Sequence, residues 1–411
     1  MVAFIAAIME CFTGYLSQQN FDSQWISTSG KDAFNAVGIG AIWNAMNVGQ
    51  MLMWHIVLAP IVLTAIIGAH ILLVRVRGVV RPLPATDPGP WRGATRRYDI
   101  LKEGTIAGVI ILALTFGLAA LLSSPNVPEL SVRTWARVAA ADFLATASTE
   151  LNGTSATATY GPPYNTNGTP QKILFAPANI LGVTQPINAA QDFVLSPLNS
   201  AVAGNPTLAA ALATYRAAPA AQQLKWANAY ASAVTKVKFV GGAPVVPAAA
   251  DGPVPVMLAN ELTMARSGAL DADLLAQNAF YGTNFTLPLM FVNDGSYFAS
   301  QAEAMHLAGD QWGVMNETGS YPGQPWLWLY TLWYQTSWGN SPNADLIAIY
   351  LTGLATILLL LVPFIPGLRD IPGLIPVHRL IWRDGQGTPP PSAGQAHDTL
   401  VNIKSPPSDI A

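Results

Sequence analysis

Long apolar stretches constrain this chain more than any other feature of its sequence. A helix that crosses a bilayer needs about 20 largely apolar residues. Residues 50–74, 104–122 and 344–365 meet this requirement, and residues 2–17 form a shorter stretch that Glu10 interrupts. The pattern predicts an all-α membrane protein with four transmembrane helices.

The composition agrees with a membrane location and excludes several classes of protein. Charged residues make up only 10% of the chain, against about 25% in an ordinary soluble domain. The formal net charge of −3 argues against nucleic acid as a partner. Cys11 is the single cysteine, so this chain alone cannot form a disulfide, an iron–sulfur cluster or a covalent c-type haem site. We expect it to pack as a small residue in the first span.

The distribution of cations predicts the orientation of the spans. Seven lysines or arginines fall within residues 75–102, and three more lie within 20 residues after residue 365, at positions 369, 379 and 383. Residues 123–343 hold only eight. Cation-rich loops stay in the cytoplasm. We therefore expect an inner-membrane protein with both termini in the cytoplasm and residues 123–343 outside it.

The chain is accordingly divided into four parts. Residues 1–122 form a membrane domain, 123–343 a large extracytoplasmic insertion, 344–366 the fourth transmembrane helix, and 367–411 a cytoplasmic tail whose Pro-rich end, from about residue 385, is expected to be disordered. In the insertion, patterns typical of helices occur at residues 131–149, 206–237 and 271–281, and turn-forming runs occur at 160–170 and 241–255. The insertion is predicted to be mostly helical.

Two histidines in the second span are the strongest candidates for a functional role. An imidazole in an apolar span is costly and requires a reason. His55 and His70 are 15 residues apart, which places them about 22 Å apart along a helix and about 60° apart around it. They would share one face, with His55 near the outer leaflet and His70 near the inner one. This arrangement favours axial ligation of two b-type haems over hydrogen bonds to a neighbouring helix.

Each six-coordinate haem needs a second axial ligand. The remaining histidines are His306, in the insertion, and His378 and His397, in the tail, so none lies in a span. We expect the missing ligands to come from another polypeptide. Glu10, a carboxylate inside the first span, is either part of a proton path or paired with a neighbouring side chain.

Four short motifs occur in an order that resembles one family. They are Phe12-Thr13-Gly14-Tyr15-Leu16; Trp54-His55 with Gly68-Ala69-His70; Tyr98-Asp99-Ile100-Leu101-Lys102-Glu103-Gly104; and Pro325-Trp326-Leu327-Trp328 followed by Ser341-Pro342-Asn343. The series resembles the third to sixth helices of the cytochrome b subunit of quinol–cytochrome c oxidoreductases and its chloroplast-type relatives. The resemblance covers residues 1–129 and 321–383, the middle of that family's helical bundle.

The resemblance implies a set of roles. His55 and His70 would ligate the outer and inner haem b, Gly14 would let a haem approach closely, and Arg75 would lie near the inner haem. Lys102 and Glu103 would hydrogen-bond and protonate quinone at an inner site, although positive-inside anchoring also explains all three charged residues. Pro325, Trp326 and Trp328 would line an outer quinol pocket. Since aromatic rings also collect at membrane interfaces, an aromatic belt remains the alternative for residues 321–338.

The chain departs from the family in three places. The first two helices are missing, which a split form with a separate small cytochrome b subunit would explain. Pro325-Trp326-Leu327-Trp328 stands where the family has Pro-Glu-Trp-Tyr, and Gln324 precedes the proline, so the glutamate that takes a proton from quinol has no counterpart. The insertion is far longer than the usual connection. The outer quinol site is therefore expected to be altered, moved or lost.

The resulting hypothesis is a subunit of a quinol-oxidising, bc-type respiratory or photosynthetic enzyme. It would carry electrons between two b haems across the membrane and would not be catalytic alone. Expected partners are the small cytochrome b subunit, a Rieske-type iron–sulfur protein, a c-type cytochrome, quinone and membrane lipid. Two alternatives remain: a di-haem membrane anchor of a dehydrogenase without quinol bifurcation, and a haem-free structural membrane subunit.

Overall fold

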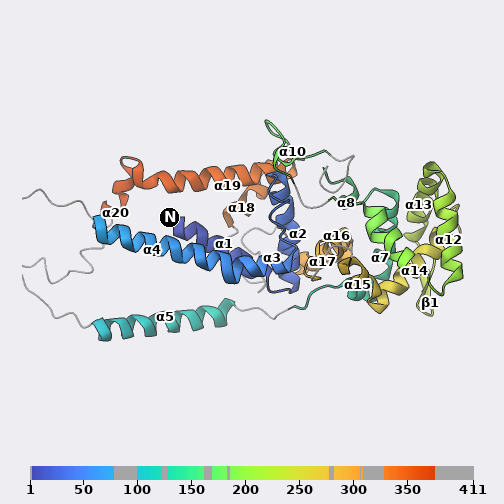
Figure 1. Ribbon diagram of the computed structural model, residues 1–411, viewed down its shortest axis with the longest axis horizontal. Coiled ribbons are helices and arrows are strands. Elements are labelled where there is room, and N and C mark those ends of the chain that lie inside the picture. Colours follow the sequence, from blue (N-terminus) through green and yellow to red (C-terminus); the bar gives the residue numbers. More distant parts are fainter. Residues whose placement is uncertain are drawn as a thin grey trace, which may run out of the picture. The chain divides into compact units, whose positions relative to one another are not determined.

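The computed structural model describes residues 2–77, 100–122, 127–161, 169–182, 186–276, 282–305, 307–308 and 328–374 (Figure 1). The contacts between residues divide the chain into two units, Met1–Val76 with Phe116–Ile357 and Arg77–Thr115 with Leu358–Ala411. The Pro-rich end, Pro325 and Trp326 lie outside the described residues, as do His306, His378 and His397.

Within the described ranges, three helices are long and apolar enough to cross a membrane: Val48–Arg77, Leu101–Leu118 and Ala344–Phe364. They correspond to the second, third and fourth predicted spans. The first predicted span is helix α1 (Val2–Leu16), which has 15 residues and a length of about 22 Å. The described chain is therefore mostly helical with three candidate membrane spans, and α1 is a shorter apolar helix.

The histidine-bearing span is not a uniform α-helix. It consists of α3 (Val48–Met53), the π-helical turn η1 (Trp54–Leu58) and α4 (Ala59–Arg77), and it starts at Asn47, whose side chain accepts a hydrogen bond from the Gln50 amide. Proline at position 60 has no N–H to give the carbonyl of residue 56 and would clash with it in a regular helix. The wider π turn relieves this conflict. No residue of α4 is buried.

The connection between α1 and α3 contains a helix that the sequence did not predict. Helix α2 (Phe21–Ala36) begins at Asn20, whose side chain accepts a hydrogen bond from the Ser23 amide. Most of α2 is buried although its mean hydropathy is low, because it packs on apolar groups on both sides. One of these contacts is a small cluster made of Tyr15, Leu16, Ile26, Ala45 and Met51.

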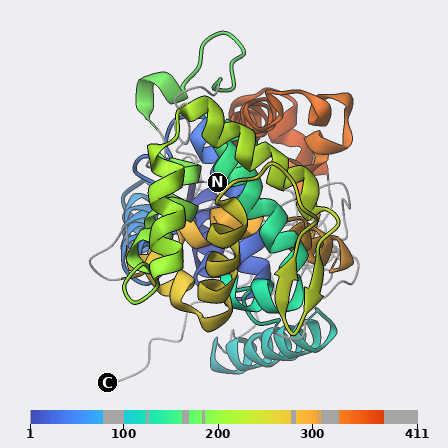
Figure 2. The same ribbon diagram turned by 90° about the vertical axis from the view of Figure 1, so that its right-hand side faces the viewer.

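The described part of residues 127–308 is called the inter-span domain. Its elements are α6 (Val132–Val138), α7 (Ala140–Asn152), α8 (Ala156–Thr159), α10 (Ala178–Leu181), η2 (Ala190–Leu195), α11 (Ser196–Ser200), α12 (Pro206–Ala217), α13 (Ala220–Val234), β1 (Lys238–Val240), β2 (Ala243–Val245), α14 (Val254–Ser267), α15 (Ala269–Ala276), α16 (Thr286–Asn293) and α17 (Ser296–Ala304). β1 and β2 form an antiparallel hairpin, seen in Figure 2.

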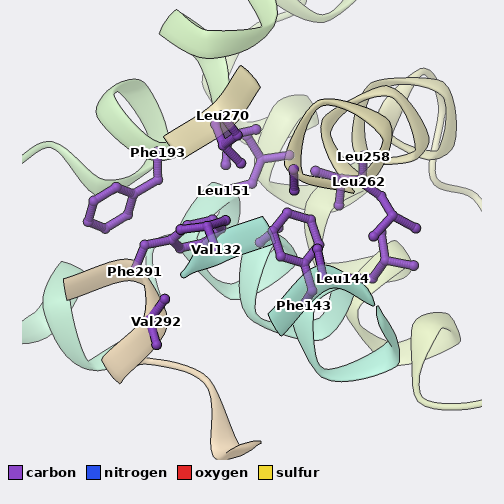
Figure 3. Packing of buried hydrophobic residues seen from close by; sticks show 14 of the residues in the cluster. Val132, Phe143, Leu144, Leu151, Phe193, Leu258, Leu262, Leu270, Phe291 and Val292 are labelled. Carbon is purple, nitrogen blue, oxygen red and sulfur yellow. The ribbon is translucent and has the colours of Figure 1, made fainter. Parts of the chain in front are cut away.

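The core of the inter-span domain is aromatic and aliphatic. Trp135 and Phe143 both meet Phe291 edge to face, and Phe193 stacks on Phe291 with the ring centroids 5.2 Å apart. Figure 3 shows Phe143, Phe193 and Phe291 among the surrounding leucines and valines. Phe21 of α2 also belongs to this core. The inter-span domain is thus anchored on α2.

The predicted helices of this domain are only partly correct. Residues 131–149 form α6 and α7, which separate at Ala139, and residues 206–237 form α12 and α13, which Pro219 separates. The third prediction, residues 271–281, is helical up to Ala276 in α15, and residues 277–281 lie outside the described residues. The predicted turn-forming run 241–255 extends two residues too far, because Val254 and Pro255 already belong to the first turn of α14, where proline is tolerated.

The segment before the last span is a series of short helices. These are α18 (Trp328–Leu332), η4 (Trp333–Gln335) and η5 (Ser337–Asn340), followed by α19 (Ala344–Leu361). Trp333 Nε1 donates a 3.0 Å hydrogen bond to Thr352 Oγ1, which fixes η4 on α19. The remaining elements are α5 (Ile100–Leu122), η6 (Val362–Phe364), η7 (Leu368–Asp370) and α20 (Ile371–Leu374).

Candidate functional site

The imidazole of His55 is held by α1. Its Nδ1 atom lies 3.2 Å from Glu10 Oε1 and 3.1 Å from the Glu10 carbonyl oxygen. The His55 side chain is 36% exposed and that of Glu10 is 21% exposed. Of the two expectations for Glu10, pairing with a neighbouring side chain is confirmed, and the neighbour is a predicted haem ligand.

These contacts select one tautomer of His55. A carboxylate and a carbonyl oxygen can only accept hydrogen bonds, so the proton belongs on Nδ1. The lone pair is then on Nε2, and no described residue hydrogen-bonds to that atom. Metal-ligating histidines commonly donate their second N–H to a carboxylate or carbonyl in this way, which fixes the ring orientation and raises the basicity of the ligand. The donor chemistry of His55 therefore fits axial ligation of a haem iron.

Gly14 lies directly against the same ring. A β-carbon built on residue 14 would stand 2.5 Å from His55 Cε1 and 2.9 Å from Nε2. The absence of a side chain at position 14 therefore makes room for the imidazole itself. Among the predicted site residues, this is the pair that the described contacts bring together.

His70 lies in α4 with an exposed side chain, and no hydrogen bond joins it to another described residue. The π turn changes the geometry of the pair slightly. A π turn holds about one residue more than an α turn. The 15-residue spacing of His55 and His70 therefore corresponds to about 14 residues of regular α-helix, which places them about 21 Å apart along the axis and about 40° apart around it. The two histidines still share one face of the helix Val48–Arg77.

The other predicted residues belong to other parts of the chain. Arg75, on the last turn of α4, is exposed and belongs to the first unit. Lys102 and Glu103 are exposed on the first turn of α5 and belong to the second unit. Trp328 begins α18.

A cavity of about 450 Å³ lies between α1, α2, α18 and α19. Its walls are mostly apolar and include Phe12 of α1, Trp25 of α2 and Ile349 of α19. Its polar groups are Asp32, Tyr330, Tyr334 and Asp345. This cavity is called the aromatic pocket. Small-molecule sites in proteins are typically apolar cavities of about 300–1,000 Å³ with a few convergent polar groups, and the aromatic pocket has both properties.

Three polar groups of the aromatic pocket, Tyr330, Tyr334 and Asp345, form one hydrogen-bonded chain. The hydroxyls of Tyr330 and Tyr334 lie 3.1 Å apart, and the Tyr334 hydroxyl donates a short hydrogen bond to Asp345 Oδ1. Gln171 Nε2 donates a 2.6 Å hydrogen bond to the other carboxylate oxygen. A proton that reaches Tyr330 therefore has a path of hydroxyls to a carboxylate.

Burial in the pocket shifts the pKa values of these groups upward. Burial is the largest cause of the raised pKa of Tyr334, and the neighbouring Tyr330 and Asp345 add to it. Burial also raises the pKa of Asp32, and the charge of Lys31 opposes this rise. Tyr334 thus keeps its proton at neutral pH and serves as a donor to Asp345. Asp32 takes up a proton more readily than an exposed aspartate.

Only part of the aromatic pocket was predicted. Tyr330 and Tyr334 belong to the aromatic run 321–338 that was expected to form either a pocket wall or an interfacial belt, whereas Asp345 and the walls from α1 and α2 were missed. The usable signal was the pair Tyr330 and Tyr334, four residues apart and therefore on one helical face, a few residues before the carboxylate of Asp345.

Within the described residues, no group of three or more histidine, cysteine, aspartate or glutamate side chains could hold a metal ion. The single cysteine, Cys11, is exposed on α1. Comparisons with protein-family models, with curated proteins and with solved structures find no match to this chain.

Proposed function

We propose that this chain is the cytochrome b-type subunit of a quinol-oxidising electron-transfer complex in the inner cell membrane. The observation that carries the proposal is the arrangement of His55. It lies in a π turn of a membrane-length helix, its Nδ1 contacts a carboxylate and a carbonyl of α1, and its Nε2 atom is left with a lone pair. His70 stands on the same face of that helix about 21 Å away.

His55 and His70 would each hold one haem b through Nε2. Bound haem would supply reversible one-electron transfer at each depth of the membrane. The task of the protein is then to fix the ligands and tune their basicity, and Glu10 does this for His55. Since α1 contributes Glu10 and Gly14, this helix would be part of the haem site at His55 whether or not it crosses the whole bilayer.

The second ligand of each haem would come from a separate small cytochrome b subunit. Among the described residues, His55 and His70 are the only histidines. A facing helix with two histidines would also cover α4, which has no buried residue in the described structure. A Rieske-type iron–sulfur protein and a c-type cytochrome would accept the electrons that do not enter the haems.

The aromatic pocket is proposed as the outer quinol site. Its apolar walls suit the ring and isoprenoid tail of a quinol, and the chain Tyr330, Tyr334 and Asp345 offers an acceptor for the quinol proton. Asp345 would replace the glutamate that is missing next to Pro325. At the inner site, Arg75 would offset haem propionate charge, and Lys102 and Glu103 would bind and protonate quinone.

The distribution of cations supports an orientation for this complex. We propose four spans, α1 included, with both termini cytoplasmic and the inter-span domain extracytoplasmic. The aromatic pocket then faces the outer leaflet, on the side of His55, and the cation-rich segment 75–102 belongs to the cytoplasmic side.

A reduced-minus-oxidised difference spectrum of the purified assembly tests the proposal, together with a pyridine haemochrome assay. We expect two low-spin b haems, and a quinol analogue should reduce one of them first. If haem is present and quinol reduces neither haem, the chain is a di-haem anchor that takes its electrons from a dehydrogenase.

A haem-free structural subunit is the second candidate, and one observation favours it. The His55 imidazole already has a partner in Glu10 and fills the space beside Gly14. This is the arrangement expected of a histidine that only joins two helices. The absence of pyridine haemochrome from an intact, purified assembly would establish this candidate in place of the electron carrier.

A further inference from the structure

A short segment of the inter-span domain exposes an unusual amount of apolar surface. Along residues 172–182, Ile173 is 45% exposed, Leu174 is 88% exposed and Phe175 is 52% exposed. In α10, Ile180 and Leu181 are 72% and 61% exposed. No residue from 173 to 182 is charged. Contiguous exposed apolar surface of this kind marks an interaction site in a folded protein.

Hydrogen bonds fix this segment at the first turn of the span α19. Lys172 donates its backbone amide to Asn343 Oδ1 at 2.7 Å. Gln171 makes two further bonds: its Nε2 donates to Asp345 Oδ2 at 2.6 Å, and its Oε1 accepts from the Leu346 amide at 3.0 Å. Since Ala344 is the first residue of the span, the exposed side chains are held at the level where that span begins (Figure 1).

A second loop extends the same apolar surface. At Gly38, which has a φ of +81°, a β-carbon would stand 2.7 Å from Leu181 Cβ and from the Pro177 carbonyl oxygen, so the two backbones touch. At Gly182, a β-carbon would stand 3.1 Å from Ala41 Cβ. The neighbouring Ile42 is 76% exposed. The apolar face is therefore formed by two loops that support each other.

We propose that this face, made of Ile42, Ile173, Leu174, Phe175, Ile180 and Leu181, inserts into the lipid at the membrane surface beside α19. The lipid is the fitting occupant because the face is tied to the point where a membrane span begins. The single cation, Lys172, stands at the edge of the segment, where a lipid phosphate lies.

The consequence is a membrane anchor for the inter-span domain and for Asp345. Gln171 and Lys172 connect the anchor directly to Asn343 and Asp345. Insertion of the face into lipid would therefore hold the first turn of α19 at a fixed depth in the bilayer. This inference needs α19 to span the membrane, and it does not depend on haem or quinol binding.

Site-directed fluorescence in lipid nanodiscs tests the inference. The intact protein would carry Cys11→Ser to remove the native thiol, together with Leu174→Cys labelled with an environment-sensitive fluorophore. Val240→Cys is the matched control, because Val240 is apolar and 68% exposed on β1 of the same domain. The discs contain phosphatidylcholine with or without spin-labelled lipid.

We expect spin-labelled lipid to reduce the emission of the label at position 174 at least about twofold and to leave the label at position 240 unchanged. Aqueous iodide should quench position 240 more strongly than position 174. Equal quenching of both positions by iodide, with no effect of the spin-labelled lipid, would overturn the proposal. Protection of position 174 from both quenchers would also overturn it, since a protein would then cover the face.

Discussion

Gly14 and His55 lie so close together that a β-carbon on residue 14 would stand 2.5 Å from the His55 ring. Real side chains essentially never make so short a contact, so even alanine at position 14 must displace the imidazole or separate α1 from the π turn. The position of His55 thus depends on Gly14 of the neighbouring helix α1.

Gly14→Ala is therefore expected to remove most of the low-spin signal of one haem and to leave the other intact. Displacement of the imidazole would weaken the proposed ligation at His55, whereas His70 lies about 21 Å further along the helix and would keep its proposed haem. Low-temperature difference spectra measure both signals. Gly353→Ala on α19 is the control, because a β-carbon there would meet nothing within 4 Å. Equal losses in the two variants would show that the Gly14 contact has no special role.

Glu10→Gln is expected to raise the midpoint potential of one haem. The carboxylate beside Nδ1 makes His55 a stronger donor and favours the oxidised iron, and glutamine keeps the size of the side chain while removing its charge. A tenfold change in the relative stability of the two oxidation states corresponds to about 59 mV, and a rise on that order is predicted. In a redox titration, the haem at His70 serves as the internal control, and a shift of both haems would contradict the assignment.

Asp345→Asn is expected to slow quinol-dependent haem reduction by about 100-fold, because general base catalysis typically contributes 10²–10⁴-fold. Asparagine keeps a hydrogen-bond acceptor for Tyr334 and cannot take up a proton at neutral pH. The haem content should not change. Asp345→Glu retains the carboxylate and should recover much of the rate, which stopped-flow reduction by a quinol analogue would measure. A normal rate in Asp345→Asn would exclude Asp345 as the proton acceptor.

The inter-span domain is predicted to lose stability as the pH rises. Glu261 is fully buried in α14, no described residue hydrogen-bonds to its carboxyl oxygens, and burial raises its pKa well above 4.5. The folded state therefore binds the proton more tightly than the unfolded state. The free energy that this tighter proton binding adds to folding is fully present below about pH 4.5, the pKa of Glu261 in the unfolded chain. It is lost as the pH rises from there through the higher pKa of Glu261 in the folded chain.

Glu261→Gln should remove the part of this pH dependence that Glu261 causes, because glutamine is neutral at every pH. Burial also raises the pKa of Glu150 well above 4.5, so Glu150 keeps its own contribution in the variant. The melting temperature at pH 8 should rise by about 2–4 °C for each kcal/mol by which the free energy of unfolding increases. Thermal unfolding of the full assembly at several pH values from 5 to 9 would measure it. Glu303→Gln is a control on the partly exposed helix α17 and should follow the wild type. A Glu261→Gln curve that runs parallel to the wild type would show that Glu261 does not cause the pH effect.

The spans were predictable because a run of about 20 apolar residues determines a membrane helix without help from distant contacts. The prediction of an unbroken α-helix through His55 was less accurate. Pro60 indicated that the ladder of hydrogen bonds must change near residue 56, and the sequence did not specify that the change would be a π turn that includes His55. Helix α2 was missed because its polar residues are buried by partners far away in the sequence.

The candidate site shows the same limit. The histidine pair could be found from spacing alone, since both residues stand on one helix. The contact of Glu10 with His55 joins residues 45 positions apart, and the bond of Gln171 to Asp345 joins residues 174 positions apart. Neither has a local pattern that predicts it. The aromatic pocket, built from four separate segments, became visible only in the fold.

The most direct test of the account is the haem content of two single variants, His55→Leu and His70→Leu, measured per purified assembly by pyridine haemochrome and electron paramagnetic resonance. We predict two b haems in the wild type and one in each variant, with a different low-spin signal lost in each. An intact wild-type assembly without haem, or variants that both keep two haems, would contradict the assignment of His55 and His70 as axial ligands.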